Sequence, residues 1–233
     1  MTATDWTAYF DAFAPRYERA AYGGAGLAAL GERELVTVRA ALAGRAPGRV
    51  LDAGAGTGRV ARMLHALGWQ VTALDASTEM LARLGATVPR VHARLGAALP
   101  FPDAAFDAVV SLRVLKYVAQ LDAGVGELAR VLRPGGVAVL EIANRRSLAR
   151  FGYRGTSVRC ASVGETAALM RAHGLAPVSR HAGARLPHAF WARATSARAA
   201  AAVASCDRAA AAILGGDTRA IGARSVILVG ERS

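Results

Sequence analysis

The chain has 233 residues, of which 53% are hydrophobic, and its 29 lysines and arginines against 17 acidic residues give a formal net charge of +12. This length is sufficient for one large domain with a full core, and no uncharged run reaches the roughly 18–20 residues of a membrane span. The first ten residues include Asp5 and lack a basic segment followed by an apolar one, so we expect a cytoplasmic protein without a secretory signal.

The basic residues are distributed along the whole chain. Lys116 is the only lysine, and arginines are spread from Arg16 to Arg232, with no stretch that concentrates the charge together with interleaved aromatic residues. We interpret them as solvated faces, and expect no nucleic-acid and no membrane partner; an anionic small substrate stays open. Cys160 and Cys206 are far apart and lack the spacing of metal ligands, which argues against a disulfide framework and against a metal site.

The N-terminal part is predicted to be helical. Residues 4–20 are typical of a short amphipathic helix that is rich in aromatic side chains and broken near Pro15. Residues 23–26 contain three glycines and predict a flexible joint. A second helix is expected from about Leu27 to Ala43.

From Arg49 onward, strands and helices alternate. The expected strands are Arg49–Asp52, Gln70–Leu74, Arg90–His92, Phe106–Ser111, Val137–Ile142 and Ser225–Gly230, with an extended piece at Pro177–His181. The expected helices are Val60–Leu67, Thr78–Leu84 after a Ser77 cap, Leu121–Leu132, Ser162–His173 with a capping box, and the alanine-rich stretch 189–214. A turn is expected at Arg133–Gly136 and a loop over residues 144–161. This alternation predicts a doubly wound α/β fold with a mostly parallel sheet, which binds its ligand at the carboxyl ends of the strands.

A glycine-rich loop follows the first strand. Residues 50–59 read Val-Leu-Asp-Ala-Gly-Ala-Gly-Thr-Gly-Arg, and Asp75 ends the second strand. Alternate glycines allow a sharp turn and close approach of a ligand to a helix N-terminus, and a carboxylate at the spacing of Asp75 can bind both hydroxyls of a ribose. The dinucleotide fingerprint GxGxxG requires glycine at position 59, where this chain has Arg59, so a nicotinamide oxidoreductase is disfavoured.

The pattern Asp52-x-Gly54-x-Gly56-x-Gly58 resembles motif I of the class I S-adenosylmethionine-dependent methyltransferases. Later segments extend the resemblance in the same order: Leu99–Asp103, Phe106–Val110, and Val131–Gly136 followed by Val137–Leu140. The pattern is most similar to the small-molecule, type 11-like subfamily, in which N-terminal helices cover the cofactor.

The resemblance implies a Rossmann-like, mostly parallel seven-stranded sheet whose reversed last strand would be Ser225–Gly230. It also implies one methyltransferase domain over residues 1–233. Its parts would be an N-terminal helical lid (1–44), a cofactor-binding α/β core (45–180), and a helical insert with the last strand (181–233). The lid helices and the insert 189–214 are expected to close over the substrate.

S-adenosyl-L-methionine is the cofactor that the resemblance implies. The glycines would admit its methionine part, Asp52 would face its ammonium group, and Asp75 would accept both ribose hydroxyls. The alternatives are that Asp52 only orders the turn and that Asp75 only caps the helix after Ser77. The full set of expected cofactor residues is Asp52, Gly54, Ala55, Gly56, Gly58, Asp75, Ala76, Leu95, Gly96, Ser111, Tyr9 and Tyr17.

Leu95 departs from the family pattern. Many relatives have an acidic residue there, which accepts a hydrogen bond from the adenine amino group. In this chain adenine is expected to rest against Ala76, and to be held by apolar contacts and by backbone groups around Gly96 and Ala97.

The segment Ser111–Tyr117 occupies the place where relatives line the pocket beside the sulfonium, often with histidines near positions 116 and 117. The catalytic candidates are therefore Lys116 and Tyr117. Lys116 can act as a base, can hold a phenolate or carboxylate as a cation, or can simply face solvent. The expected substrate contacts are Arg113, Asn144, Tyr153 and His188.

These observations predict methyl transfer to a small molecule by in-line displacement, with O-methylation first and N- or C-methylation open. The alternatives are an RNA or protein methyltransferase, which only the net charge supports, and a cofactor-binding scaffold without catalysis. A monomer or a homodimer is expected.

Overall fold

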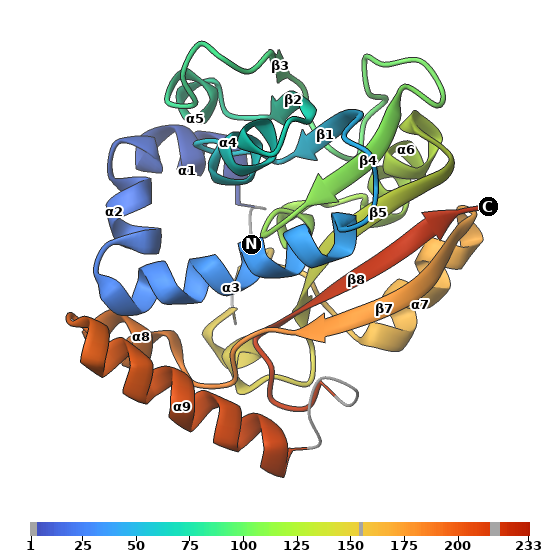
Figure 1. Cartoon of the computed structure of the whole chain (residues 1–233). Coiled ribbons are helices and arrows are strands. Elements are labelled where there is room, and N and C mark those ends of the chain that lie inside the picture. Colours follow the sequence, from blue (N-terminus) through green and yellow to red (C-terminus); the bar gives the residue numbers. More distant parts are fainter. Residues whose placement is uncertain (1–3, 154–155, 215–219) are drawn as a thin grey trace.

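The computed structural model describes residues 4–153, 156–214 and 220–233 (Figure 1). The N-terminal part forms α1 (Trp6–Phe13), a 3-10 turn at Ala14–Arg16, α2 (Tyr17–Tyr22) and α3 (Ala25–Leu42). The predicted break at Pro15 is confirmed, because proline fits the first positions of the turn but interrupts helical hydrogen bonding. The α3 helix begins two residues before the predicted start, since Gly24, at φ +81°, is its N-cap.

The centre of the molecule is a mostly parallel sheet, as predicted. Its strands are β1 (Arg49–Ala53), β2 (Gln70–Asp75), β3 (Arg90–His92), β4 (Phe106–Ser111), β5 (Leu132–Asn144), β6 (Cys160–Ala161), β7 (Leu175–Ala182) and β8 (Ser225–Arg232). In the described part of the chain, seven of them lie in the order β3-β2-β1-β4-β5-β8-β7, and the short β6 pairs with β5. The last strand, β8, runs antiparallel to β5 and β7, which confirms the reversed strand expected at Ser225–Gly230.

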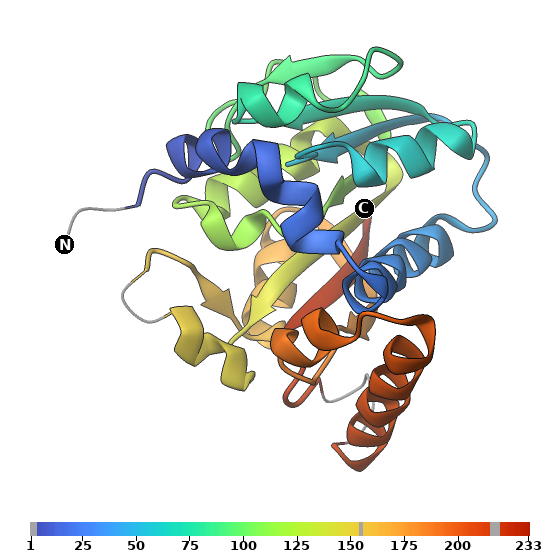
Figure 2. The same cartoon turned by 90° about the vertical axis from the view of Figure 1, so that its left-hand side faces the viewer.

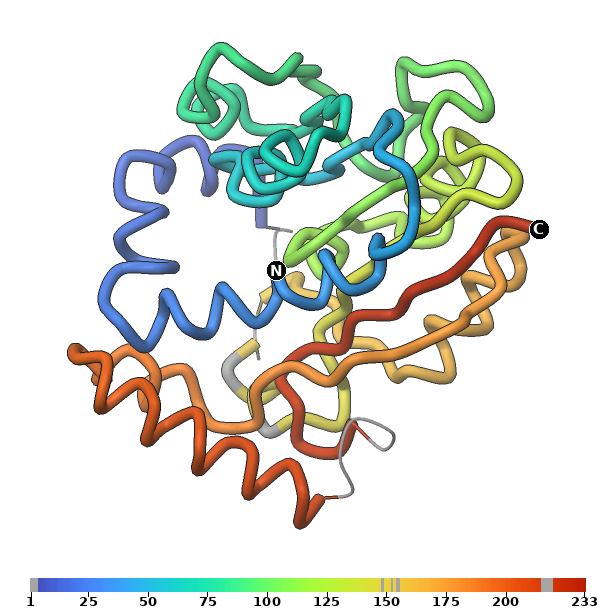
Figure 3. The backbone as a smooth tube through the Cα atoms, viewed as in Figure 1, coloured from blue at the N-terminus to red at the C-terminus, as the bar shows by residue number. Residues whose placement is uncertain are grey.

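Helices cover both faces of the sheet. The remaining helices are α4 (Arg59–Ala66), α5 (Thr78–Ala82), α6 (Leu121–Val131), α7 (Val163–Ala172), α8 (His188–Arg193) and α9 (Ala197–Ile213). The α3 and α4 helices pack on one face and α6 and α7 on the other, while α8 and α9 lie against α3, beneath it in Figures 1 and 3. A sheet covered in this way buries both sets of its alternating side chains.

The sequence of β5 illustrates this double burial. Val137 and Val139 belong to the core with α3 and α4, whereas Ala138 and Leu140 belong to the core with α6 and α7. Successive residues of a strand point to opposite faces, so a strand between two helical layers is apolar at almost every position. This explains why β1, β4 and β5 could be predicted from their composition.

Several predicted boundaries change. The expected turn at Arg133–Gly136 lies inside β5 and forms a bulge. In β4, Phe106 pairs with Leu132 and Ala108 pairs with Val137, so the four residues between these partners lie opposite a single residue of β4. The expected helix 189–214 is two helices, α8 and α9, since residues 194–196 leave the helical conformation. The expected loop 144–161 contains a 3-10 helix at Leu148–Tyr153 and the strand β6.

The predicted helix caps are present. The Ser77 hydroxyl accepts a hydrogen bond from the Met80 amide, and Ser162 forms a capping box with Glu165. Within the described residues, no helix combines the length and the apolar composition that a membrane crossing requires.

Candidate active site

The carboxyl ends of β1 and β2 form one wall of a cavity of about 560 Å³. In Figure 1 the arrow of β4 points toward the side where α1 and α2 lie, and Figure 2, seen from that side, shows these helices in front of the sheet. The sheet order reverses between β1 and β4, since β2 and β3 lie on one side of β1 and the later strands on the other. Ligands of doubly wound sheets bind at such a point.

The loop between β1 and α4 is held against β2. The amides of Gly54 and Ala55 both donate to the Leu74 carbonyl, at 2.7 and 2.9 Å. A Cβ atom on Gly54 would lie 2.5 Å from Val114, whereas a Cβ on Gly56 would meet nothing within 4 Å. Gly54 is therefore required for packing, and Gly56, at φ +55°, presents its backbone to the open cavity.

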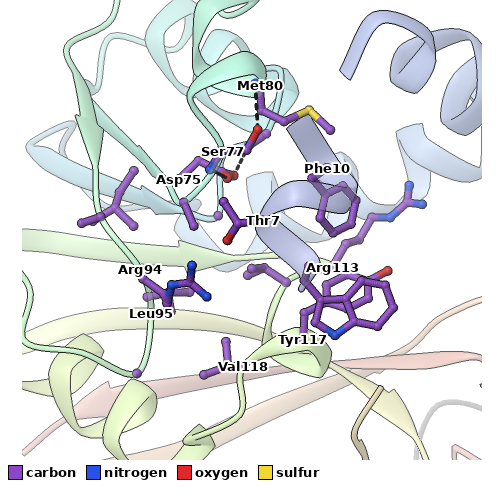
Figure 4. A pocket seen from close by; sticks show the side chains of 18 of the residues that line it. Thr7, Phe10, Asp75, Ser77, Met80, Arg94, Leu95, Arg113, Tyr117 and Val118 are labelled. Carbon is purple, nitrogen blue, oxygen red and sulfur yellow. Dashed lines mark hydrogen bonds between the residues drawn. The ribbon is translucent and has the colours of Figure 1, made fainter. Parts of the chain in front are cut away.

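Asp75 lies at the end of β2 and lines the cavity (Figure 4). Its Oδ2 accepts a hydrogen bond from the Gly56 amide at 2.8 Å, and its Oδ1 accepts one from the Ser77 amide at 2.9 Å. Burial raises the pKa of this carboxyl, although these amides oppose the shift. The carboxylate thus fixes both the glycine loop and the start of α5, and each oxygen keeps a lone pair for a ligand hydroxyl.

Asp52 is buried behind the glycine loop, with 2% of its surface exposed. Its Oδ2 has no hydrogen-bond partner among the described residues. Burial raises the pKa of Asp52 to about 7, and the nearby Asp75 carboxylate adds to this effect. A buried acceptor without a partner is unfavourable, so this atom is suited to a cationic or hydrogen-bonding ligand group.

The helix α1 forms the roof of the cavity. Asp11 accepts a hydrogen bond from the Ser77 hydroxyl at 2.6 Å, and the Trp6 indole donates to Ser157 at 2.9 Å. The Trp6 ring also packs on Tyr117, with ring centroids 4.5 Å apart. The helix is therefore attached at one end to α5 and at the other to the segment before β6.

The structure brings many of the predicted cofactor residues together around this cavity. Those in its lining are Gly54, Gly56, Asp75, Ala76, Leu95, Gly96 and Tyr17. Leu95 is buried in the core beneath the wall, and Gly96, at φ +94°, follows it in the lining. Asp52, Ala55, Gly58 and Ser111 lie behind or beside the loop rather than in the lining.

Two predicted site residues have their side chains engaged elsewhere. The Ser111 hydroxyl is fully buried and donates to the Ala53 carbonyl at 3.0 Å. The Asn144 amide donates to the carbonyls of Ala220 and Ala223 at 2.7 and 2.9 Å. Both side chains stabilise backbone that is distant in the chain, because a buried polar group has to satisfy its hydrogen bonds within the protein.

A second cavity of about 520 Å³ lies next to the first. Its lining includes Arg113, Lys116, Tyr153 and His188, which are four of the predicted catalytic and substrate residues. A small cavity of about 160 Å³ shares Tyr17 and Tyr117 with the first and Lys116 and His188 with the second, and Tyr9 also lines it. The three cavities therefore adjoin one another, and Arg113 contributes to all of them.

Arg113 has a strained backbone. It is a non-glycine residue at φ +63°, two positions after β4 ends at Ser111. Its amide donates to the Glu141 carboxylate at 2.7 Å, and its guanidinium donates to the Tyr22 hydroxyl at 3.0 Å. These contacts hold the residue between the two large cavities.

Lys116 and Tyr117 follow on the same 3-10 turn. Burial lowers the pKa of Lys116 to about 8, and the Arg113 charge adds to this effect. The Lys116 Nζ lies 5.1 Å from the centroid of the Tyr117 ring and 5.8 Å from that of Tyr153. Burial raises the pKa of Tyr117 to about 12, so its phenol is neutral near pH 7 and acts as a hydrogen-bond donor rather than a base.

Other charged residues of the second cavity are not among the site residues predicted from the sequence. Glu34, Glu141 and Arg224 all line it. Glu141 interrupts the otherwise apolar run of β5, and that interruption was the available signal. Nothing in the local sequence distinguishes Arg224 from the other arginines.

Arg59, which replaces the third glycine of the dinucleotide fingerprint, forms an ion pair with Glu34 and joins the glycine loop to α3. Within the described ranges, no group of three or more histidine, cysteine or acidic side chains could hold a metal ion.

Known proteins resemble this chain in sequence and in fold. Residues 51–140 match the family model described as a methyltransferase domain. A malonyl-[acyl-carrier protein] O-methyltransferase of Serratia marcescens is 36% identical over 155 residues, which are 65% of this chain and 60% of that protein. A demethylmenaquinone methyltransferase of Thermus thermophilus is 42% identical over 106 residues, or 42% of this chain and 48% of that protein. The chain therefore spans about half to three-fifths of the length of these relatives.

The solved structure of the [4+2]-cyclase SpnF has a TM-score of 0.75 and 21% identity, with 100% of this chain and 98% of that chain covered. This likeness is one of fold. The family match and the sequence relatives define residues 51–140 as an S-adenosylmethionine-dependent methyltransferase domain of the type 11 kind. Proteins of this family use S-adenosylmethionine as their methyl donor.

Proposed function

We propose that this protein transfers a methyl group from S-adenosylmethionine to a small-molecule acceptor. The observation that carries the proposal is the junction of two cavities at Arg113, Lys116 and Tyr117. The first cavity has the features of the cofactor site and the second is lined by polar and charged side chains. Methyl transfer requires a donor and an acceptor side by side, shielded from water.

The residues of the first cavity fit the cofactor. Asp75 would accept the ribose hydroxyls, and Gly54 and Gly56 would lie along the methionine part. The unpartnered Oδ2 of Asp52, behind the glycine loop, would reach the ammonium group through a bridging water. Adenine would lie against Ala76 and Leu95. When bound, the cofactor supplies an electrophilic methyl group. The protein then only has to orient the acceptor and exclude water.

For the finer activity we propose O-methylation. Lys116 and Arg113 can hold an acceptor oxygen in its anionic form, the form that attacks a methyl group without first losing a proton. The Serratia relative is an O-methyltransferase by name, whereas the Thermus relative is named for demethylmenaquinone. Methylation of nitrogen or carbon is the competing outcome of an acceptor screen.

Cofactor binding is tested first. Calorimetry with S-adenosylhomocysteine should give binding by the native protein and a loss of at least about tenfold in affinity for Asp75→Ala, because two charge-assisted hydrogen bonds disappear. The matched control is Asp122→Ala, which removes an exposed carboxylate on α6. Absence of binding by the native protein would overturn the proposal.

Turnover separates the enzyme from a scaffold. A cofactor with a labelled methyl group is offered with phenols, carboxylic acids, amines and transfer RNA. Label in a small molecule supports the proposal, and label in RNA contradicts the proposed acceptor class. Binding of S-adenosylhomocysteine without transfer to any class would indicate a protein that uses the fold for another purpose, as the [4+2]-cyclase SpnF does. The cytoplasmic location and the monomeric or dimeric state stay predictions.

A further inference from the structure

The second cavity has an unbalanced set of charges. Several of its charged side chains are paired with one another or with neighbours: Arg33 with Asp207, Glu32 with Arg39, and Glu34 with Arg59. Three cations of the lining remain, Arg113, Lys116 and Arg224, and within the part of the chain that the structure describes none of them has a carboxylate at ion-pair distance.

Only one further carboxylate of the lining lies near these cations. Glu141 is buried and accepts a hydrogen bond from the Arg113 amide, so one of its oxygens is engaged with the backbone. Apart from Glu34, which is paired with Arg59, three positive side chains therefore stand against one carboxylate of the lining. Half-buried charges of one sign repel each other and are stabilised by a counter-charge.

The three cations are close enough to influence each other. Burial lowers the pKa of Lys116 most, and the charges of Arg113 and Arg224 lower it further. The pKa of His188 is likewise lowered first by burial and then by the charges of the same two arginines. The Lys116 ammonium also faces the rings of Tyr117 and Tyr153, which stabilise a cation. With a pKa of about 8, Lys116 is mostly protonated at pH 7.

We propose that the second cavity selects acceptors that carry a carboxylate, which binds between the Lys116 ammonium and the Arg224 guanidinium. A guanidinium can donate two parallel hydrogen bonds to a carboxylate, and the ammonium adds a third. Arg113 lies where this cavity adjoins the cofactor cavity. The inference rests on the proposed function, because it takes the second cavity as the acceptor site.

The single lysine of the chain provides a direct test. Protein that contains lysine labelled with ¹³C at Cε gives one side-chain resonance, which reports the titration of Lys116 alone. Benzoate, added with saturating S-adenosylhomocysteine, should shift this resonance saturably and raise the midpoint of its titration, because an anion stabilises the ammonium form. Benzamide, of the same shape without the charge, should do neither.

Charge-matched variants locate the binding site. Arg224→Gln should weaken benzoate binding at least about tenfold, and Arg224→Lys should restore part of it. The control is Arg171→Gln, which removes the same charge from an exposed position on α7, across the sheet. Calorimetry with Lys116→Met, which lacks the lysine signal, should show the same loss as Arg224→Gln.

The outcomes are separable. If S-adenosylhomocysteine binds but benzoate binds no more tightly than benzamide, or if phenol binds and benzoate does not, the carboxylate site is overturned and the proposed function stands. If S-adenosylhomocysteine does not bind, the proposed function fails, and the titration without it still shows whether the cavity binds a carboxylate. Equal losses in Arg224→Gln and Arg171→Gln would indicate non-specific attraction and would also overturn the site.

Discussion

At the scale of single residues, two aspartates in one site have different tasks. Asp75 holds the amides of Gly56 and Ser77, so the interpretations as ribose ligand and as helix cap are compatible. Asp52 instead carries a buried oxygen without a partner in the described structure. Such an atom is costly for folding, and proteins keep such costs where a ligand removes them.

Asp52→Asn should stabilise the ligand-free protein above pH 7 while weakening S-adenosylhomocysteine binding. The native pKa of about 7 lies above the unfolded value, so the folded state binds more protons and the free energy of unfolding falls as pH rises from about 4 to about 7. Because asparagine does not ionise, the variant should regain up to about 4 kcal/mol of the free energy of unfolding at pH 8. Urea unfolding of the native protein and of Asp52→Asn, at pH 5 and at pH 8, measures this difference in the free energy of unfolding. An equal pH dependence in the two proteins would contradict the assignment.

Lys116 can serve as base or as cation, and the two roles give opposite pH trends. A base becomes active as pH rises through its pKa of about 8, whereas a binding cation is lost over the same range. The groups that face Lys116 are Arg113, Arg224, Glu34, Glu141, Tyr117, Tyr153 and Cys160.

We expect the cation role. Lys116→Arg should keep kcat/KM within about threefold, Lys116→Met should raise the acceptor KM at least about tenfold, and the native KM should rise above pH 8. Steady-state kinetics with an acceptor from the labelled-methyl screen measures these values. Activity that increases with pH through 8 and disappears in Lys116→Arg would identify a base instead.

At the scale of elements, α1 is the part most suited to open and close. It is one helix with no fully buried residue, attached through Asp11 to Ser77 and through Trp6 to Ser157. Its aromatic side chains pack on Tyr117, so the same residues form the roof of one cavity and the wall of another. Weakly held elements of this kind control ligand exchange.

Asp11→Asn should accelerate the release of S-adenosylhomocysteine, because the charge-assisted bond to the Ser77 hydroxyl becomes a neutral one. The Ser77 hydroxyl still accepts from Met80, so α5 keeps its cap. Stopped-flow displacement should show a dissociation rate about three- to tenfold higher, with little change in thermal stability. Glu18→Gln, on the exposed side of α2, is the control. Equal rates in all three proteins would show that α1 does not limit release.

At the scale of the whole molecule, the order of the elements could be predicted almost completely. Apolar runs such as Phe106–Ser111 are recognisable because the sheet is covered on both faces. The boundaries are harder to predict: the sequence predicts a turn at Arg133–Gly136, but tertiary pairing with β4 extends β5 through it. Ser111 and Asn144 were predicted for the site from their positions alone, and hydrogen bonds to distant backbone engage their side chains instead.

The sequence by itself determined the fold class, the glycine loop and the place of Asp75, because these depend on local backbone conformation and on the short distance between β1 and β2. Only the tertiary structure brought Lys116, Arg224 and Glu141 into the lining of one cavity, and Arg59 next to Glu34. Those residues lie on elements far apart in the chain. Their charges interact only when the sheet places them around one cavity, and no local pattern records that proximity.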